Sequence, residues 1–129
     1  MDAVKVTAQW VDGSEIWHKW GTPAAFSAFG DALDGGWRGT VSIREAGQPA
    51  GDILRAILVR ETDATRITFA REATTVVISG STAALRLLAA NLKQLGQLLT
   101  PGGGPTHWDY FDGHPLVDEG SAPTAVWLT

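Results

Sequence analysis

Two stretches of the sequence, "GTPAAFSAFGDAL" (residues 21–33) and "GSTAALRLLAANL" (residues 80–92), align without gaps after a shift of 59 positions. The glycine, two alanines and the final leucine are identical, and Thr22 matches Ser81 as a helix N-cap residue. Bulky apolar residues also match, so both stretches carry the stripe of an amphipathic helix. The alignment therefore predicts two helices of the same construction in one chain.

Residues with special backbone properties mark the ends of these helices. Pro23 takes the first helical position, where its missing N–H costs nothing, and Gly35 and Gly36 supply a left-handed stop. We therefore expect helices at residues 21–36 and 80–100. The apolar stripe of the second helix comprises Leu85, Leu88, Leu92, Leu95 and Leu99.

Strands flank both helices. Residues 4–10 alternate apolar and polar side chains, and the Asp-Gly step that follows in "VDGS" is a strong hairpin signal. The expected strands are residues 4–10, 15–20, 37–45, 52–61, 65–71, 74–79, 106–112 and 124–128. The strands before and after each helix give the order ββαββ in residues 1–61 and again in residues 62–129.

An internal duplication would explain this repeated order. The alternative is coincidence, because capping residues and apolar stripes follow from physics and make any two amphipathic helices look alike. In either case the fold class is α+β. We expect one compact domain over residues 1–129, with two helices on one face of a long antiparallel sheet or with two small antiparallel sheets back to back.

Composition narrows the function. The chain of 129 residues has a net charge of −4 and no cysteine, which excludes disulfides and thiolate metal sites. Its acidity argues against nucleic-acid binding as the main task. A signal-peptide pattern and a membrane-spanning apolar run are not evident. We expect a cytoplasmic protein with no nucleic-acid or membrane partner.

The stretch "HWDYFDGH" (residues 107–114) gathers residue types that bind metals or transfer protons. On a strand, His107 and Asp109 share one face, whereas Asp112 precedes a glycine in a turn. A metal site needs three or four convergent ligands, and a general base needs a second catalytic group. Neither set is evident, so we expect no catalytic, metal-binding or cofactor-binding residues. A small ligand- or metal-binding domain that uses the His107/Asp109 strand is the alternative.

The chain contains six tryptophans, a large number for its length. Trp17 and Trp20 fall on opposite faces of one expected strand, so one of them is expected nearer the surface. Exposed tryptophan beside charged residues is typical of hot spots in protein interfaces. The alternative is that all six tryptophans belong to the core.

The second half of the chain resembles a bacterial immunity-protein family, the one numbered thirty-two among the immunity proteins of polymorphic toxins. The resemblance rests on "TTVVISGSTAALRLLAANLKQLGQ", a glycine-rich loop and "HWDYFDGHPLVDEGSAPTAVWL", and covers residues 75–128. It implies a small α+β protein without enzymatic activity, which neutralises a cognate toxin by occluding its active surface.

If that toxin is a nuclease with a basic cleft, acidic side chains would mimic phosphates and steer association. The residues expected to contact the partner are Trp17, Trp20, His107, Asp109, Asp112, Asp118 and Glu119. A further hypothesis is a homodimer, in which an open edge strand at residues 124–128 pairs with its twin. An enzyme is the least supported class, because the sequence shows no nucleophile elbow and no phosphate-binding loop.

Overall fold

The structure, a computed structural model, describes residues 6–11, 15–20, 23–43, 52–98, 106–108, 116–118, 120–122 and 124–128. Its elements are β1 (Val6–Val11), β2 (Glu15–Trp20), α1 (Pro23–Asp34), β3 (Gly39–Ser42), β4 (Asp52–Leu54), β5 (Ala56–Glu61), β6 (Thr68–Glu72), β7 (Thr75–Gly80), α2 (Thr82–Leu98), β8 (Thr106–Trp108) and β9 (Thr124–Leu128). The α+β class expected from the sequence is confirmed, with both helices at their expected places.

The strands form two sheets, and both sheets are mixed. The five-stranded sheet has the order β4-β1-β2-β9-β8, and the four-stranded sheet has the order β3-β5-β7-β6. Neighbouring strands are antiparallel except for β2 with β9 and β5 with β7, which run parallel. The expectation of purely antiparallel sheets was therefore wrong. The parallel pairs arise because each sheet joins a hairpin from one half of the chain to a hairpin from the other half.

The expected strand at residues 52–61 is divided at Arg55. The Arg55 N–H donates to the Thr74 carbonyl at 2.7 Å, and the Arg55 carbonyl accepts from the Ile43 N–H at 2.8 Å. Before this residue the chain pairs with β1, and after it the chain pairs with β3 and β7. Arg55 is therefore the point where one continuous segment leaves the five-stranded sheet and enters the four-stranded sheet.

The two parallel pairs begin at related positions of β2 and β7. In the five-stranded sheet the pairing of β2 with β9 begins at Ile16 opposite Thr124. In the four-stranded sheet the pairing of β7 with β5 begins at Thr75 opposite Ala56. Ile16 and Thr75 are separated by the same shift of 59 positions that aligns the helical sequences. The topology thus repeats between the halves, while descent from a duplicated ββαββ unit remains a prediction.

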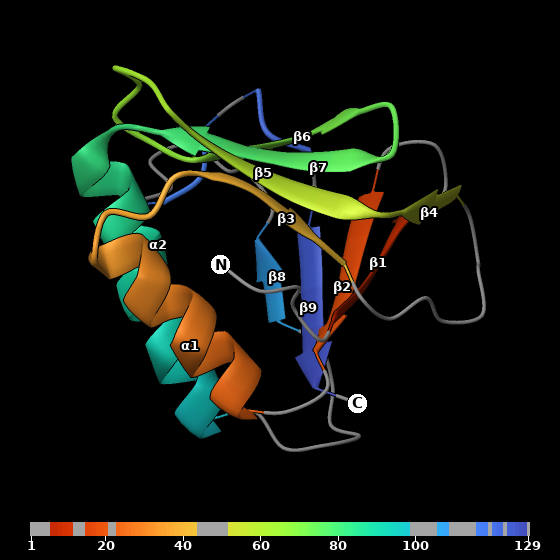
Figure 1. Cartoon of the computed structure of the whole chain (residues 1–129), viewed down its shortest axis with the longest axis horizontal. Coiled ribbons are helices and arrows are strands. Elements are labelled where there is room, and N and C mark those ends of the chain that lie inside the picture. The colour runs from red at the N-terminus through yellow and green to blue at the C-terminus, as the bar shows by residue number, and fades with distance from the viewer. Residues whose placement is uncertain are drawn as a thin grey trace.

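The two helices lie side by side, next to the two sheets (Figure 1). Phe29 and Leu33 of α1 and Leu85 and Leu88 of α2 are fully buried in one core cluster with residues of both sheets, because each helix turns its apolar stripe inward. Among the described residues, no helix is both long and apolar enough to cross a membrane.

Candidate functional site

The structure brings two of the expected contact residues into one row of the five-stranded sheet. Trp17 of β2 pairs with Ala125 of β9, and Ala125 pairs in turn with His107 of β8. Adjacent strands are about 4.8 Å apart, so the backbones of Trp17 and His107 lie roughly 10 Å from each other. Trp20 lies three residues further along β2, opposite Leu128.

The expected acidic contact residues are only partly described. Asp109, Asp112 and Glu119 lie outside the described residues, and the proposed pair of His107 and Asp109 therefore lies outside them as well. Asp118 is half-buried. Among the residues that the structure does describe, no group of three or more His, Asp or Glu side chains is placed to hold a metal ion.

Asp118 belongs to a segment that covers one edge of the four-stranded sheet. Its N–H donates to the Ile67 carbonyl at 2.7 Å, and the Ile67 N–H donates to the Leu116 carbonyl at 2.7 Å. Further along, the Ser121 hydroxyl accepts from the Phe69 N–H at 2.9 Å, and the Ala122 N–H donates to the Phe69 carbonyl at 2.8 Å. Residues 116–118 and 121–122 are therefore bonded to Ile67 and Phe69, at the outer edge of β6.

The edge strand expected at residues 124–128 is an interior strand. β9 lies between β2 and β8 and pairs with both of them. It pairs with β2 over its whole length and with β8 over Thr124–Val126, so it is not the edge strand that a twin would need. The prediction that residues 124–128 form an open edge strand for a homodimer is therefore wrong. Local alternation predicts a strand but not its place in the sheet, because strand order depends on which hairpins meet in space.

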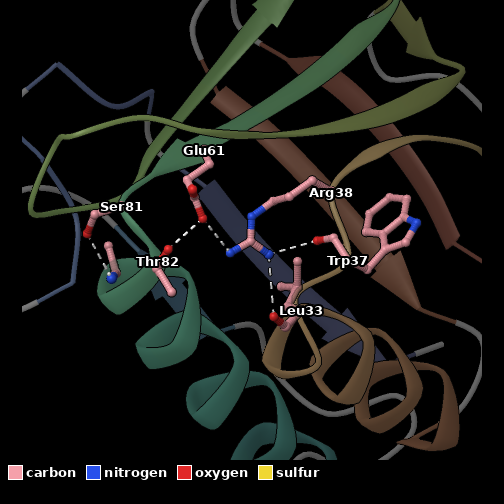
Figure 2. Close-up of polar contacts among 7 residues, drawn as sticks. Leu33, Trp37, Arg38, Glu61, Ser81 and Thr82 are labelled. Carbon is pink, nitrogen blue, oxygen red and sulfur yellow. Dashed lines mark hydrogen bonds and ion pairs between the residues drawn. The ribbon is translucent and has the colours of Figure 1, made fainter.

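A polar junction joins the end of α1 to the start of α2 (Figure 2). The Arg38 Nη2 lies 3.0 Å from the Glu61 Oε1, and the Thr82 hydroxyl donates to the same oxygen at 2.5 Å. The Arg38 Nη1 donates to the carbonyls of Trp37 at 2.8 Å and Leu33 at 3.5 Å. One guanidinium group thus serves the C-terminal end of α1 and a carboxylate beside the first residue of α2.

The charges of this junction favour the ionised form of Glu61. The hydrogen bond from Thr82, and then the hydrogen bond from Arg38, lower the pKa of the Glu61 carboxyl below its ordinary value. The buried Nε of Arg38 has no hydrogen-bond partner among the described residues. Arg38, Glu61 and Thr82 bond to one another in this junction, so its geometry is that of a structural link between the helix ends.

Sequence reasoning identified Ser81 as an N-cap but missed the rest of this junction. The Ser81 hydroxyl accepts from the Ala84 N–H at 3.2 Å, as a capping residue does. Arg38 and Glu61 stand 23 positions apart in expected strands, and neither has a local signal that points to the other. Their partnership exists only because β3 and β5 pair.

A comparison with protein families confirms the resemblance seen in the second half of the chain. The model of the family described as Immunity protein 32 matches residues 75–128. This segment begins with β7, includes α2 and β8, and ends with β9. It therefore contributes strands to both sheets but covers less than half of the chain. No curated protein and no solved structure matches the chain.

Proposed function

We propose that this chain is an immunity-type binding protein, which neutralises a cognate bacterial toxin in the cytoplasm by occluding the toxin's active surface. The observation that carries the proposal is the match of residues 75–128 to the Immunity protein 32 family. In this proposal the chain performs no chemistry of its own, and its folded surface is what acts on the toxin.

The five-stranded sheet supplies the proposed contact surface. Its strands β2, β9 and β8 place Trp17 and His107 in one row, and β8 and β9 fall within the family match. Trp20, three residues further along β2, belongs to the opposite face by the alternation of strand residues. Tryptophan is enriched among residues that dominate binding energy. Asp109 and Asp112 follow β8 directly in the sequence, and Asp118 and Glu119 precede β9. These four acids are proposed to steer a basic toxin toward the sheet.

Growth rescue tests the proposal. The polymorphic toxin encoded beside this chain's gene is induced in a sensitive bacterium, with and without the chain, and the two purified proteins are mixed for size-exclusion chromatography. We expect growth to be restored and a stable complex to form. Growth arrest despite abundant soluble chain, together with separate elution of the two proteins, would contradict the proposal.

Single substitutions locate the surface. Trp17→Ala and His107→Ala should each weaken the complex, and Arg86→Ala on the exposed side of α2 is the matched control. A hot-spot tryptophan typically costs 2 kcal/mol or more on truncation, which corresponds to a loss of roughly thirty-fold in affinity. Equal affinity for all three variants would place the contact elsewhere on the molecule.

A further inference from the structure

The two edge strands of the four-stranded sheet, β3 and β6, differ in whether other parts of the chain bond to their outer sides. At β6 the outward-facing backbone groups of Ile67 and Phe69 are bonded to residues 116–122. At the opposite edge, β3 pairs only with β5. One edge is therefore closed by the chain itself, and the other is open within the described residues.

The direction of the free groups on β3 follows from its pairing. The Ile43 N–H donates to the Arg55 carbonyl at 2.8 Å, so residue 43 points its backbone groups toward β5. Backbone groups alternate along an antiparallel strand, which turns those of Thr40 and Ser42 away from β5. No hydrogen bond of the described structure uses these outward N–H and carbonyl groups, and both side chains are exposed.

β3 is short, with four residues, but it lacks the side-chain features that normally block an open edge. Natural edge strands carry lysine, proline, inward charges or bulges that prevent pairing with another chain. The strand "GTVS" (residues 39–42) has none of these, and its pairing with β5 is regular over all four residues. Its side chains are uncharged and match the hydroxyl-rich and β-branched composition of cross-strand pairs.

The charges beside this edge specify the kind of segment that fits. Arg38, at one end of β3, is paired with Glu61. Arg55, whose carbonyl is bonded to Ile43 beyond the other end, is exposed and makes no side-chain hydrogen bond or ion pair among the described residues. A strand added beside β3 would run two strand spacings, about 10 Å, from the Arg55 backbone. That distance suits an arginine and a carboxylate that reach toward each other.

We propose that β3 receives an extended segment of the toxin that carries a carboxylate opposite Arg55, so that the four-stranded sheet gains a fifth strand in the complex. The inference rests on the proposed function and adds a second, backbone-mediated contact to it. The segment is recognised by main-chain hydrogen bonds to Thr40 and Ser42, as in other cases of strand addition.

The test uses the full chain and the inactivated toxin encoded beside its gene. Ser42→Pro removes one outward N–H without touching the bonds to β5, and Ser42→Ala, which keeps that N–H, is its matched control. We expect Ser42→Pro to weaken toxin binding about ten-fold or more, since each interface hydrogen bond lost leaves a toxin carbonyl unsatisfied. Arg55→Gln should also weaken binding, whereas Arg86→Gln should not.

Amide hydrogen exchange gives a readout that needs no substitution. In the free protein the Thr40 and Ser42 amides should exchange rapidly, and toxin should slow both of them. Binding of the wild-type chain with unchanged exchange at both amides would overturn the strand addition and leave the proposed function standing. Absence of toxin binding by the wild-type chain would overturn both. A dimer of the chain alone that Ser42→Pro dissolves would assign the edge to a second copy and overturn the toxin segment.

Discussion

Lys93 binds Asp34, which lies 59 positions earlier in the chain, with 3.3 Å between the Lys93 Nζ and the Asp34 Oδ2. Gly30 and Ala89 have the same separation in sequence and also meet, because a Cβ on Gly30 would lie 3.0 Å from the Ala89 carbonyl oxygen. Positions related by a two-fold axis contact each other only beside that axis. The contacts Lys93–Asp34 and Gly30–Ala89 each join positions that the shift of 59 relates. They are therefore what a pseudo-two-fold axis between α1 and α2 predicts.

Gly30 lies where the two helices approach each other closely. An added Cβ would lie 3.0 Å from the Ala89 carbonyl oxygen and 3.1 Å from the Lys93 Cγ, so these neighbours would have to give way by a few tenths of an ångström. We expect Gly30→Ala to lower the free energy of unfolding by about 1–3 kcal/mol, as overpacked cores do. Urea unfolding measures the change. Gly120→Ala, which would meet nothing within 4 Å, should differ from wild type by less than about 0.5 kcal/mol.

The ion pairs of Lys93 predict a stability difference at alkaline pH. The hydrogen bond with Asp31 at 3.1 Å, followed by the bond with Asp34, raises the pKa of Lys93 above its ordinary value of 10.5. A raised pKa stabilises the fold at any pH below that ordinary value, and the contribution disappears as the pH rises through the folded-state pKa.

Lys93→Met should therefore be slightly less stable than wild type at pH 8, and the difference should shrink as the pH rises above 10.5. The effect is small because the side chains are exposed to salt and water. Urea midpoints at pH 8 and at pH 11 measure it. Arg86→Met, an exposed cation on the same helix, is the control and should show no such convergence.

Glu61 predicts the opposite dependence at acid pH. Its pKa is lowered by the hydrogen bonds from Thr82 and Arg38, so its contribution is fully present above the ordinary value of 4.5. The contribution is lost as the pH falls through the lowered pKa. Glu61→Gln should be less stable than wild type near pH 7 and should approach it at low pH. Thermal unfolding between pH 7 and pH 2.5 measures the difference.

The control for Glu61 is Asp63→Asn, two residues further along. Asp63 is also exposed but has no ion pair or side-chain hydrogen bond among the described residues. The Asp63→Asn variant should have the same thermal stability as wild type throughout the measurement. A Glu61→Gln variant with the stability of Asp63→Asn at every pH would mean that the polar junction contributes nothing to the fold.

Local pattern predicted the elements of this fold because element type depends on neighbouring residues. Leu85, Leu88 and Leu92 are buried as their spacing indicated, and Ser81 caps α2. The division at Arg55 had no such signal, because residues 52–61 contain no glycine or proline that would mark a break in a strand. The partner of a strand beyond its own hairpin depends on packing in space, so the parallel pairs were not predictable.

In the candidate site too, local features were predictable from the sequence and long-range contacts were not. The sequence identified Trp17, Trp20 and His107 as strand residues, but it could not show that Trp17 and His107 share a row through Ala125. Nor could it show that β3 has an open edge within the described part of the chain, while residues 116–118 and 121–122 cover the edge at β6. Both features join parts of the chain that are far apart in sequence.

The acids that follow β8 give the last prediction. With a nuclease toxin that has a basic cleft, Asp109 and Asp112 are proposed to act through long-range attraction, which raises the association rate and is screened by salt. We expect Asp109→Asn with Asp112→Asn to slow association and to flatten its dependence on ionic strength, while dissociation changes little. Stopped-flow kinetics from low to physiological salt measures both rates. Asp31→Asn with Asp34→Asn on α1 removes the same charge from the helix side, so equal slowing by both double variants would mean that only net charge matters.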